Sequence, residues 1–183
     1  MERTVVGPME LRHGRWQDVL ADVHACDLLL CDPPYSARTH AGRRTGRDGK
    51  GGCSGIDYDA LPVMDTLSLA TWAAERVREF AVIFGDHETV RQWRDAFDGA
   101  GWYVFPPSIW HKTQAAPRFQ GDGPGCSVEQ ICVARRRVNL RRKEHRADHF
   151  SGPPDLGAQV AGAKPVWLMQ ALIAAYSEPG DLV

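Results

Sequence analysis

The amino-acid sequence predicts an α/β fold in which helices flank a mostly parallel sheet. Strand-like runs alternate with amphipathic helical patterns along most of the chain, as such a sheet requires. The clearest strand is the largely apolar run at residues 26–31, which leads directly into Asp32, Pro33, Pro34 and Tyr35. Open α/β sheets bind their ligands beyond the carboxyl ends of their strands. We therefore expect these four residues at the ligand-binding edge of the sheet.

Each further element is predicted from its hydrophobic pattern and from the residues that end it. A helix at 87–98 carries Val90, Trp93 and Phe97 on one stripe and is ended by Gly99. The complete set comprises strands near residues 9–13, 26–31, 80–84, 102–110 and 128–134, with helices near residues 15–21, 65–79, 87–98 and 165–177.

Proline marks two of these elements. Pro106 and Pro107 interrupt the strand at 102–110, because proline cannot donate to a strand ladder. The last helix is expected to begin with Pro165 at its first position, where proline is favoured.

Two stretches show no periodicity, although the whole of residues 1–183 is expected to form a single catalytic domain. Residues 36–60 are rich in Gly, Arg and Ser, and residues 136–162 are basic and then rich in Gly and Pro. Loops of this length are usually functional or disordered. The first stretch directly follows Tyr35, so it is well placed to close over a ligand. The second is expected to be a linker.

The composition is that of a soluble globular chain. It has 183 residues, of which 43% are hydrophobic and 25% charged, and its net charge is −1. The overall charge gives no reason to expect a polyanionic partner, but the cations are clustered. Arg135–Arg137, Arg141–Lys143 and the arginines of loop 36–60 could each neutralise phosphates or simply be solvated surface.

Cysteine usage and hydropathy exclude several classes of protein. The five cysteines include no C-x-x-C pair, which favours a reduced, cytoplasmic compartment. The spacing of Cys and His residues does not fit zinc ligands, so no metal is expected. No apolar run approaches the ~18 residues of a membrane span, so no membrane association is expected.

The residues that follow the strand at 26–31 suit the binding of an exocyclic amino group on a flat base. The carboxylate of Asp32 and the carbonyl of Pro33 can both accept hydrogen bonds from an –NH₂ group, and proline has no N–H to compete. Tyr35 can stack on the face of the base. The alternative is that the two prolines merely form a turn.

With its later segments, the chain resembles the amino-methylating DNA methyltransferases, in which Asp-Pro-Pro-Tyr is the catalytic motif and S-adenosylmethionine the methyl donor. The resemblance runs from about Met9 to Val183, and Ala163-Lys164-Pro165 with residues 176–183 resembles the lysine-proline helix that leads into the cofactor strand. The catalytic motif precedes the cofactor region, as in the circularly permuted class. Arg38-Thr39-His40 after the motif resembles phage-type adenine methylases.

This resemblance implies a Rossmann-like methyltransferase fold and a set of site residues. The catalytic residues would be Asp32, Pro33, Pro34 and Tyr35, and Asp32, Lys164 and Pro165 would lie near S-adenosylmethionine. Double-stranded DNA would contact Tyr35, Ser36, Arg38, Trp110 and Lys112. For Trp110, Lys112 and Lys164, a core or surface role remains the alternative.

The resemblance also implies that the cofactor half is incomplete. In the family, P-G-D-x-V is followed by a D-P-x-x-G-x-G loop, whereas this sequence ends at Val183. We expect the missing strand to pair beside residues 28–31, and a continuation or a second polypeptide to supply the loop.

The expected reaction is methyl transfer to adenine N6 in DNA, as in restriction-modification systems. Family members with Asp at the first motif position mostly methylate adenine, and those with Ser mostly methylate cytosine N4. Two alternatives stay open, namely a cytosine-N4 methyltransferase and a truncated, catalytically inactive DNA-binding fragment or subunit.

Overall fold

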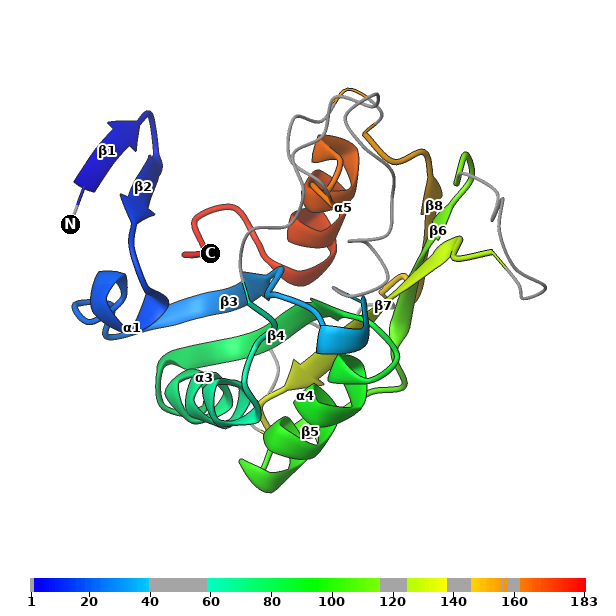
Figure 1. The fold of residues 1–183 in the computed structure, drawn as a ribbon. Coiled ribbons are helices and arrows are strands. Elements are labelled where there is room, and N and C mark those ends of the chain that lie inside the picture. Colours follow the sequence, from blue (N-terminus) through cyan, green and yellow to red (C-terminus); the bar gives the residue numbers. More distant parts are fainter. Residues whose placement is uncertain (1, 40–58, 116–124, 138–145, 156, 158–161) are drawn as a thin grey trace.

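The computed structural model describes residues 2–39, 59–115, 125–137, 146–155, 157 and 162–183. Figure 1 shows a central sheet covered by helices, with a small hairpin to one side. The strands are β1 (Glu2–Val6), β2 (Met9–His13), β3 (Cys26–Cys31), β4 (Val77–Gly85), β5 (Tyr103–Val104), β6 (Ser108–Lys112), β7 (Val128–Arg135) and β8 (His149–Gly152). The helices are α1 (Trp16–Val19), α3 (Val63–Arg76), α4 (Thr89–Gly99) and α5 (Val166–Tyr176).

The central sheet has six strands in the described residues. Its order is β3-β4-β7-β6-β8, and β5 pairs with β7. Strand β3 is parallel to β4, and β8 is parallel to β6, whereas β7 is antiparallel to β4, β5 and β6. Five of these six strands therefore point the same way and β7 runs opposite. The mostly parallel α/β fold predicted from the sequence is confirmed.

Different helices cover the two faces of the sheet. Side chains alternate between the faces of a strand, so neighbouring residues of β4 join different cores. Phe80, Val82 and Phe84 pack with residues of α5, whereas Ala81 and Ile83 pack with residues of α3 and α4. Figure 1 shows α5 on one side of the sheet and α3 and α4 on the other. A slip of one residue would exchange the two sets, so the register is strongly specified.

The predicted helices are present, with shifts at their ends; α3 ends at Arg76, and residues 77–79, which were expected to be helical, form the start of β4. Helix α5 begins at Val166, one residue later than expected, because Pro165 has the extended conformation (φ −65°, ψ 142°) of the residue that precedes a helix. Helix α4 ends at Gly99, and Gly101 follows with φ +82°, a conformation that glycine adopts readily. None of the helices in the described ranges is long and apolar enough to cross a membrane.

Two described strands lie outside the predicted elements. Strand β1 pairs with β2 in an exposed antiparallel hairpin, whose turn contains Gly7 (φ +59°). Strand β8 lies inside the stretch 136–162 that was expected to be a linker, and it pairs in parallel with β6. Its four residues show little strand pattern, since a distant partner determines the pairing. Residues 40–58 of the first expected loop lie outside the described residues.

The chain after α5 returns to the outer side of β3. The Leu182 carbonyl accepts hydrogen bonds from the backbone N–H groups of Asp27 (2.8 Å) and Leu28 (3.2 Å). The Leu182 N–H donates to the Asp27 carboxylate at 3.0 Å. The described chain therefore reaches the edge of β3 at which a further strand is expected.

Candidate active site

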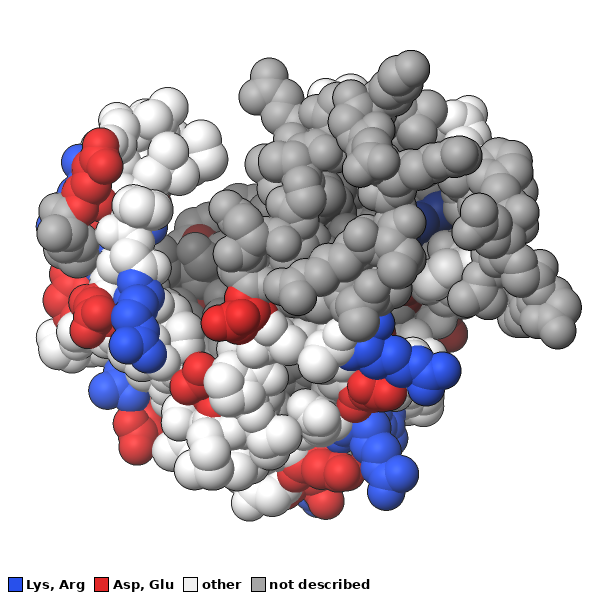
Figure 2. Space-filling view, viewed as in Figure 1, with Lys and Arg blue, Asp and Glu red and all other residues white. Residues whose placement is uncertain are grey.

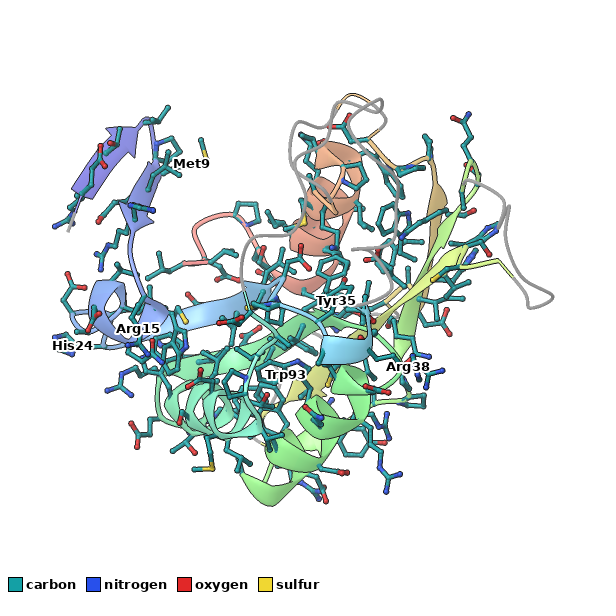
Figure 3. The ribbon with its side chains drawn as sticks, viewed as in Figure 1. Met9, Arg15, His24, Tyr35, Arg38 and Trp93 are labelled. Carbon is teal, nitrogen blue, oxygen red and sulfur yellow. The ribbon has the colours of Figure 1, made fainter. Side chains whose placement is uncertain are left out.

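Asp32 directly follows β3, at the edge of the sheet where β4 also ends. The two strands are parallel, and Cys31 lies opposite Ile83. Pro33 is buried and Pro34 half-buried beyond this edge. Tyr35 then packs against the core on the α5 side of the sheet, as Figure 3 shows. The motif therefore places a carboxylate and an aromatic ring near each other at the carboxyl edge of the sheet.

Lys164 lies two residues before α5 and extends its ammonium group to Asp32. Its Nζ is 2.8 Å from Asp32 Oδ2 and 3.3 Å from Glu129 Oε2. The same ammonium lies 5.2 Å from the centre of the Tyr35 ring and 4.9 Å from that of Phe84, within the range of cation–π attraction. The Lys164 side chain is 6% exposed, against 34% for Asp32. Lys164 is thus a buried cation that is paired with the more accessible carboxylate of Asp32.

Glu129 joins the other groups of the cluster. It accepts a hydrogen bond from the Tyr35 hydroxyl at 2.8 Å through Oε2, and another from Lys112 Nζ through Oε1. Because β7 runs opposite to β3, its second residue lies at the same edge of the sheet as Asp32. The Glu129 side chain is 8% exposed, and a buried carboxylate of this kind needs such partners.

The electrostatics distinguish the two carboxylates. Burial raises the pKa of Asp32; Lys164 only partly offsets this, and the charge of Glu129 raises the pKa further. Burial also opposes the charge of Glu129, but Lys164 and Lys112 outweigh it and lower the pKa of that group. Asp32 is therefore the carboxylate with the less compensated charge, and additional hydrogen-bond donors would stabilise it.

A third carboxylate, Asp86 directly after β4, holds the chain that follows the motif. It accepts hydrogen bonds from Ser36 N (3.0 Å), Ser36 Oγ (2.5 Å) and Thr39 Oγ1 through Oδ2. Its Oδ1 accepts from the backbone N–H groups of Glu88 (3.1 Å) and Thr89 (2.8 Å), at the start of α4. Partial burial opposes the charge of Asp86, but these hydrogen bonds hold its pKa well below the usual range.

The residues expected to contact DNA have very different environments. Arg38 has 77% of its side chain exposed, whereas Ser36 is buried. Trp110 is 1% exposed and packs edge-on against Trp167, with ring centres 6.4 Å apart. Lys112 lies over the Trp110 ring at 5.1 Å and bonds to the buried carboxylate of β7 described above. Of these expected DNA contacts, Arg38 has the most accessible side chain.

The arginine cluster Arg135–Arg137 lies at the opposite end of β7 from the candidate site. Arg135 pairs with Phe80 near the start of β4, and Arg136 donates to the Ala74 carbonyl at 2.7 Å. Figure 2 shows the described cations interspersed with carboxylates on the face in view. The basic residues at 43, 44, 47, 50 and 141–143 lie outside the described residues.

Glu129 and Asp86 are not among the site residues predicted from the sequence, although the position of each in the sequence pattern indicates a role. Glu129 occupies the same face of β7 as Ile131 and Val133, which belong to the α5-side core. An acidic side chain that alternates in phase with the core residues of a buried strand also points toward the core. Such a carboxylate needs buried partners, and it has either a functional or a structural role. Asp86 follows a buried strand just as Asp32 does, at the edge where ligands bind.

Comparison with solved structures identifies proteins of the same architecture. The crystal structure of M1.HpyAVI in complex with SAM (S-adenosylmethionine) has a TM-score of 0.60 and 16% sequence identity, covering 90% of this chain and 72% of that one. M1.HpyAVI without a stated ligand has a TM-score of 0.60 and 17% identity, covering 93% and 76%. TTHA0409 of Thermus thermophilus, a candidate DNA modification methylase, has 0.60 and 16%, covering 92% and 75%. These structures share the chain's fold.

The likeness lies in the structure more than in the sequence. No family model matches the chain, and a search of curated proteins finds no match. At 16–17% identity, the fold is what these comparisons establish.

Proposed function

We propose that this protein is a DNA methyltransferase, which transfers a methyl group from S-adenosylmethionine to the exocyclic amine of adenine at N6. The observation that carries the proposal is the undercompensated Asp32 carboxylate beside the Tyr35 ring, with Lys164 beneath them. This group stands at the carboxyl edge of the sheet, where folds of this type hold their ligands. The shared fold with M1.HpyAVI and TTHA0409 supports the reaction class as an analogy.

The roles of Asp32 and Pro33 follow from the weak nucleophilicity of an aromatic amine. Its nitrogen is a poor nucleophile, because the lone pair is delocalised into the ring. Asp32 and the Pro33 carbonyl would each accept one N–H bond, which favours a pyramidal nitrogen and stabilises the positive charge that develops on it. Asp32 gains from such donors because its own charge is poorly compensated. Tyr35 would stack on the base once the base is flipped out of the duplex.

The residues present also fit the amino-acid end of S-adenosylmethionine. That end carries an ammonium and a carboxylate; the Lys164 ammonium would attract the carboxylate, and the second oxygen of Asp32, beside the one that faces Lys164, would accept from the ammonium. Pro165 fixes the backbone at the start of α5 and so holds Lys164 in place. When bound, the cofactor supplies a methyl group on a positively charged sulfur, which is electrophilic.

The DNA contacts would be divided between exposed and enclosed residues. Arg38 is an exposed cation three residues after Tyr35 and would bind a phosphate. Ser36 would hold the local backbone through Asp86, while Lys112, which lies over the Trp110 ring, would hold Glu129 from β6.

The decisive experiment is methyl transfer from labelled S-adenosylmethionine to duplex DNA of mixed sequence, followed by identification of the modified base. We expect N6-methyladenine. Label in N4-methylcytosine would keep the reaction class and change the target base. DNA binding without any transfer would favour the inactive DNA-binding alternative and overturn the proposed function.

A further inference from the structure

Glu129 lies at the point where the groups of the candidate site meet. Asp32 and Tyr35 come from the end of β3, Lys164 from the start of α5 and Lys112 from the end of β6. Glu129 contacts Tyr35, Lys112 and Lys164 directly, and its Oε2 serves both the Tyr35 hydroxyl (2.8 Å) and the Lys164 ammonium (3.3 Å).

We propose that Glu129 is a positioning residue for methyl transfer, which fixes the Tyr35 ring and the Lys164 ammonium beside Asp32 through a single buried carboxylate. The inference rests on the proposed function and adds to it a residue that is not part of the Asp-Pro-Pro-Tyr motif. Glu129 contacts neither base nor methyl group in this role; it acts through its two neighbours.

The Tyr35 hydroxyl gives this role its geometry. A stacking ring held only by packing can shift and tilt, whereas a hydrogen bond from its far end to a fixed carboxylate holds the hydroxyl in place and so sets the direction of the long axis of the ring. Glu129 is itself held from the other side by Lys112. The position of the ring on which a flipped base would stack is therefore set from β7.

The charge of Glu129 has a separate effect on Lys164. The ammonium lies between two carboxylates, at 2.8 Å from Asp32 and 3.3 Å from Glu129. When a target amine donates to Asp32, Glu129 still neutralises the charge of Lys164. Lys164 can then lose its bond to Asp32 without being left unpaired. Without Glu129, Lys164 would be paired with Asp32 alone and would compete with the amine.

The test combines Tyr35→Phe, Glu129→Gln and the double variant, with Tyr103→Phe and Glu75→Gln as matched controls. Tyr103 and Glu75 are exposed and lie away from the site, the former at the opposite end of β7. The measurements are single-turnover transfer, the KM for DNA, and the emission of a fluorescent purine placed at the target position. Tyr35→Phe removes one hydroxyl and keeps the ring that packs against the core, so it keeps the test independent of any folding defect in Glu129→Gln.

We expect Tyr35→Phe and Glu129→Gln each to slow transfer by about tenfold or more, the usual effect of losing a hydrogen bond to a charged group. The double variant should be less impaired than the product of the two losses, because both single variants lose the same hydrogen bond between Tyr35 and Glu129. The acid limb of the pH profile of Glu129→Gln should move to lower pH, since a negative charge facing Asp32 is lost, while Lys164 and Tyr35 remain there. The controls should match the wild type.

The outcomes separate the two proposals. Wild-type protein that methylates DNA, together with an unimpaired Tyr35→Phe or with losses that simply multiply, would overturn the role of Glu129 alone. Wild-type protein that transfers no methyl group to any DNA would overturn the proposed function, and the role of Glu129 with it.

Discussion

In the proposed reaction Asp32 accepts hydrogen bonds from an amine most strongly when it is charged, yet its surroundings disfavour that charge. Burial and Glu129 raise its pKa above the ordinary value of 3.8. Below that raised pKa the group is protonated and loses acceptor capacity. We expect kcat/KM to fall as the pH is lowered through this pKa, in a range where an ordinary aspartate is still ionised. A pH–rate profile measures this, and an acid limb at or below pH ~4, the value for an unperturbed Asp, would contradict it.

Asp32→Asn separates the role of the charge from that of shape. The amide keeps the size of the side chain but offers less stabilisation to positive charge that grows on the amine. Single-turnover transfer should fall by about 10²–10³-fold, the range for losing one group that stabilises the transition state. DNA affinity should stay within a few-fold of the wild type. Asp95→Asn, on the exposed side of α4, is the matched control.

Asp86→Asn tests how the end of β4 holds the segment after the motif. The neutral amide cannot replace the charge-assisted bonds to Ser36, Thr39 and the start of α4. We expect the free energy of unfolding at pH 7 to fall by about 1.5–3 kcal/mol, the contribution of hydrogen bonds to a charged group.

The pH dependence of this loss checks its cause. The pKa of Asp86 is depressed, so its contribution is fully present above the unfolded value of 3.8 and disappears as the pH falls through the lower folded value. The difference between the wild type and Asp86→Asn should therefore shrink on acidification below pH ~4, near the unfolded pKa. A constant difference, measured by denaturant unfolding at pH 7 and at pH 3, would show that the charge is not responsible.

At the scale of elements, β8 and α5 approach each other through a glycine. A methyl group on Gly152 would lie 2.4 Å from Cζ2 of Trp167. The Trp167 ring packs edge-on against Trp110, which limits its freedom to move away. Gly152→Ala should lower the free energy of unfolding by about 1–3 kcal/mol, as overpacking usually does. Gly99→Ala at the end of α4, where nothing lies within 4 Å, should cost little or nothing. Equal stability of the two variants, measured by urea unfolding, would mean that β8 can move away from α5.

Local pattern predicted the elements that carry their own hydrophobic signal. The run at 26–31 became β3, and the stripe of Val90, Trp93 and Phe97 became the buried face of α4. Strand β8 could not be predicted, because it forms only by pairing with β6. The two strands are far apart in the sequence: His111 of β6 and Ser151 of β8, whose side chains are in contact, are separated by 40 residues.

At the scale of the whole molecule, the sheet decides which residues meet. The sequence indicated Asp32, Tyr35 and Lys164 through motifs, and the structure brings these three together. Glu129 could not be placed beside Tyr35 from the sequence, because that contact depends on β7 running against its neighbours. Trp110 was expected to contact DNA, and that expectation stays a prediction for a side chain that is 1% exposed here.

The separation of the site residues along the chain has a consequence for biosynthesis. Tyr35 and Glu129 are 94 residues apart, and Asp32 and Lys164 are 132 apart. A ribosome releases the motif long before it releases α5, and until α5 docks, one apolar face of β4 has no cover. The nascent chain should therefore lack the Asp32–Lys164 pair until α5 has been made, and its uncovered apolar face should favour chaperone binding during that interval. In ribosome-stalled chains of increasing length, protease resistance of β4 should appear abruptly once α5 has emerged. Resistance that grew steadily from the first hundred or so residues, the size of many independently folding domains, would show that the sheet matures without it.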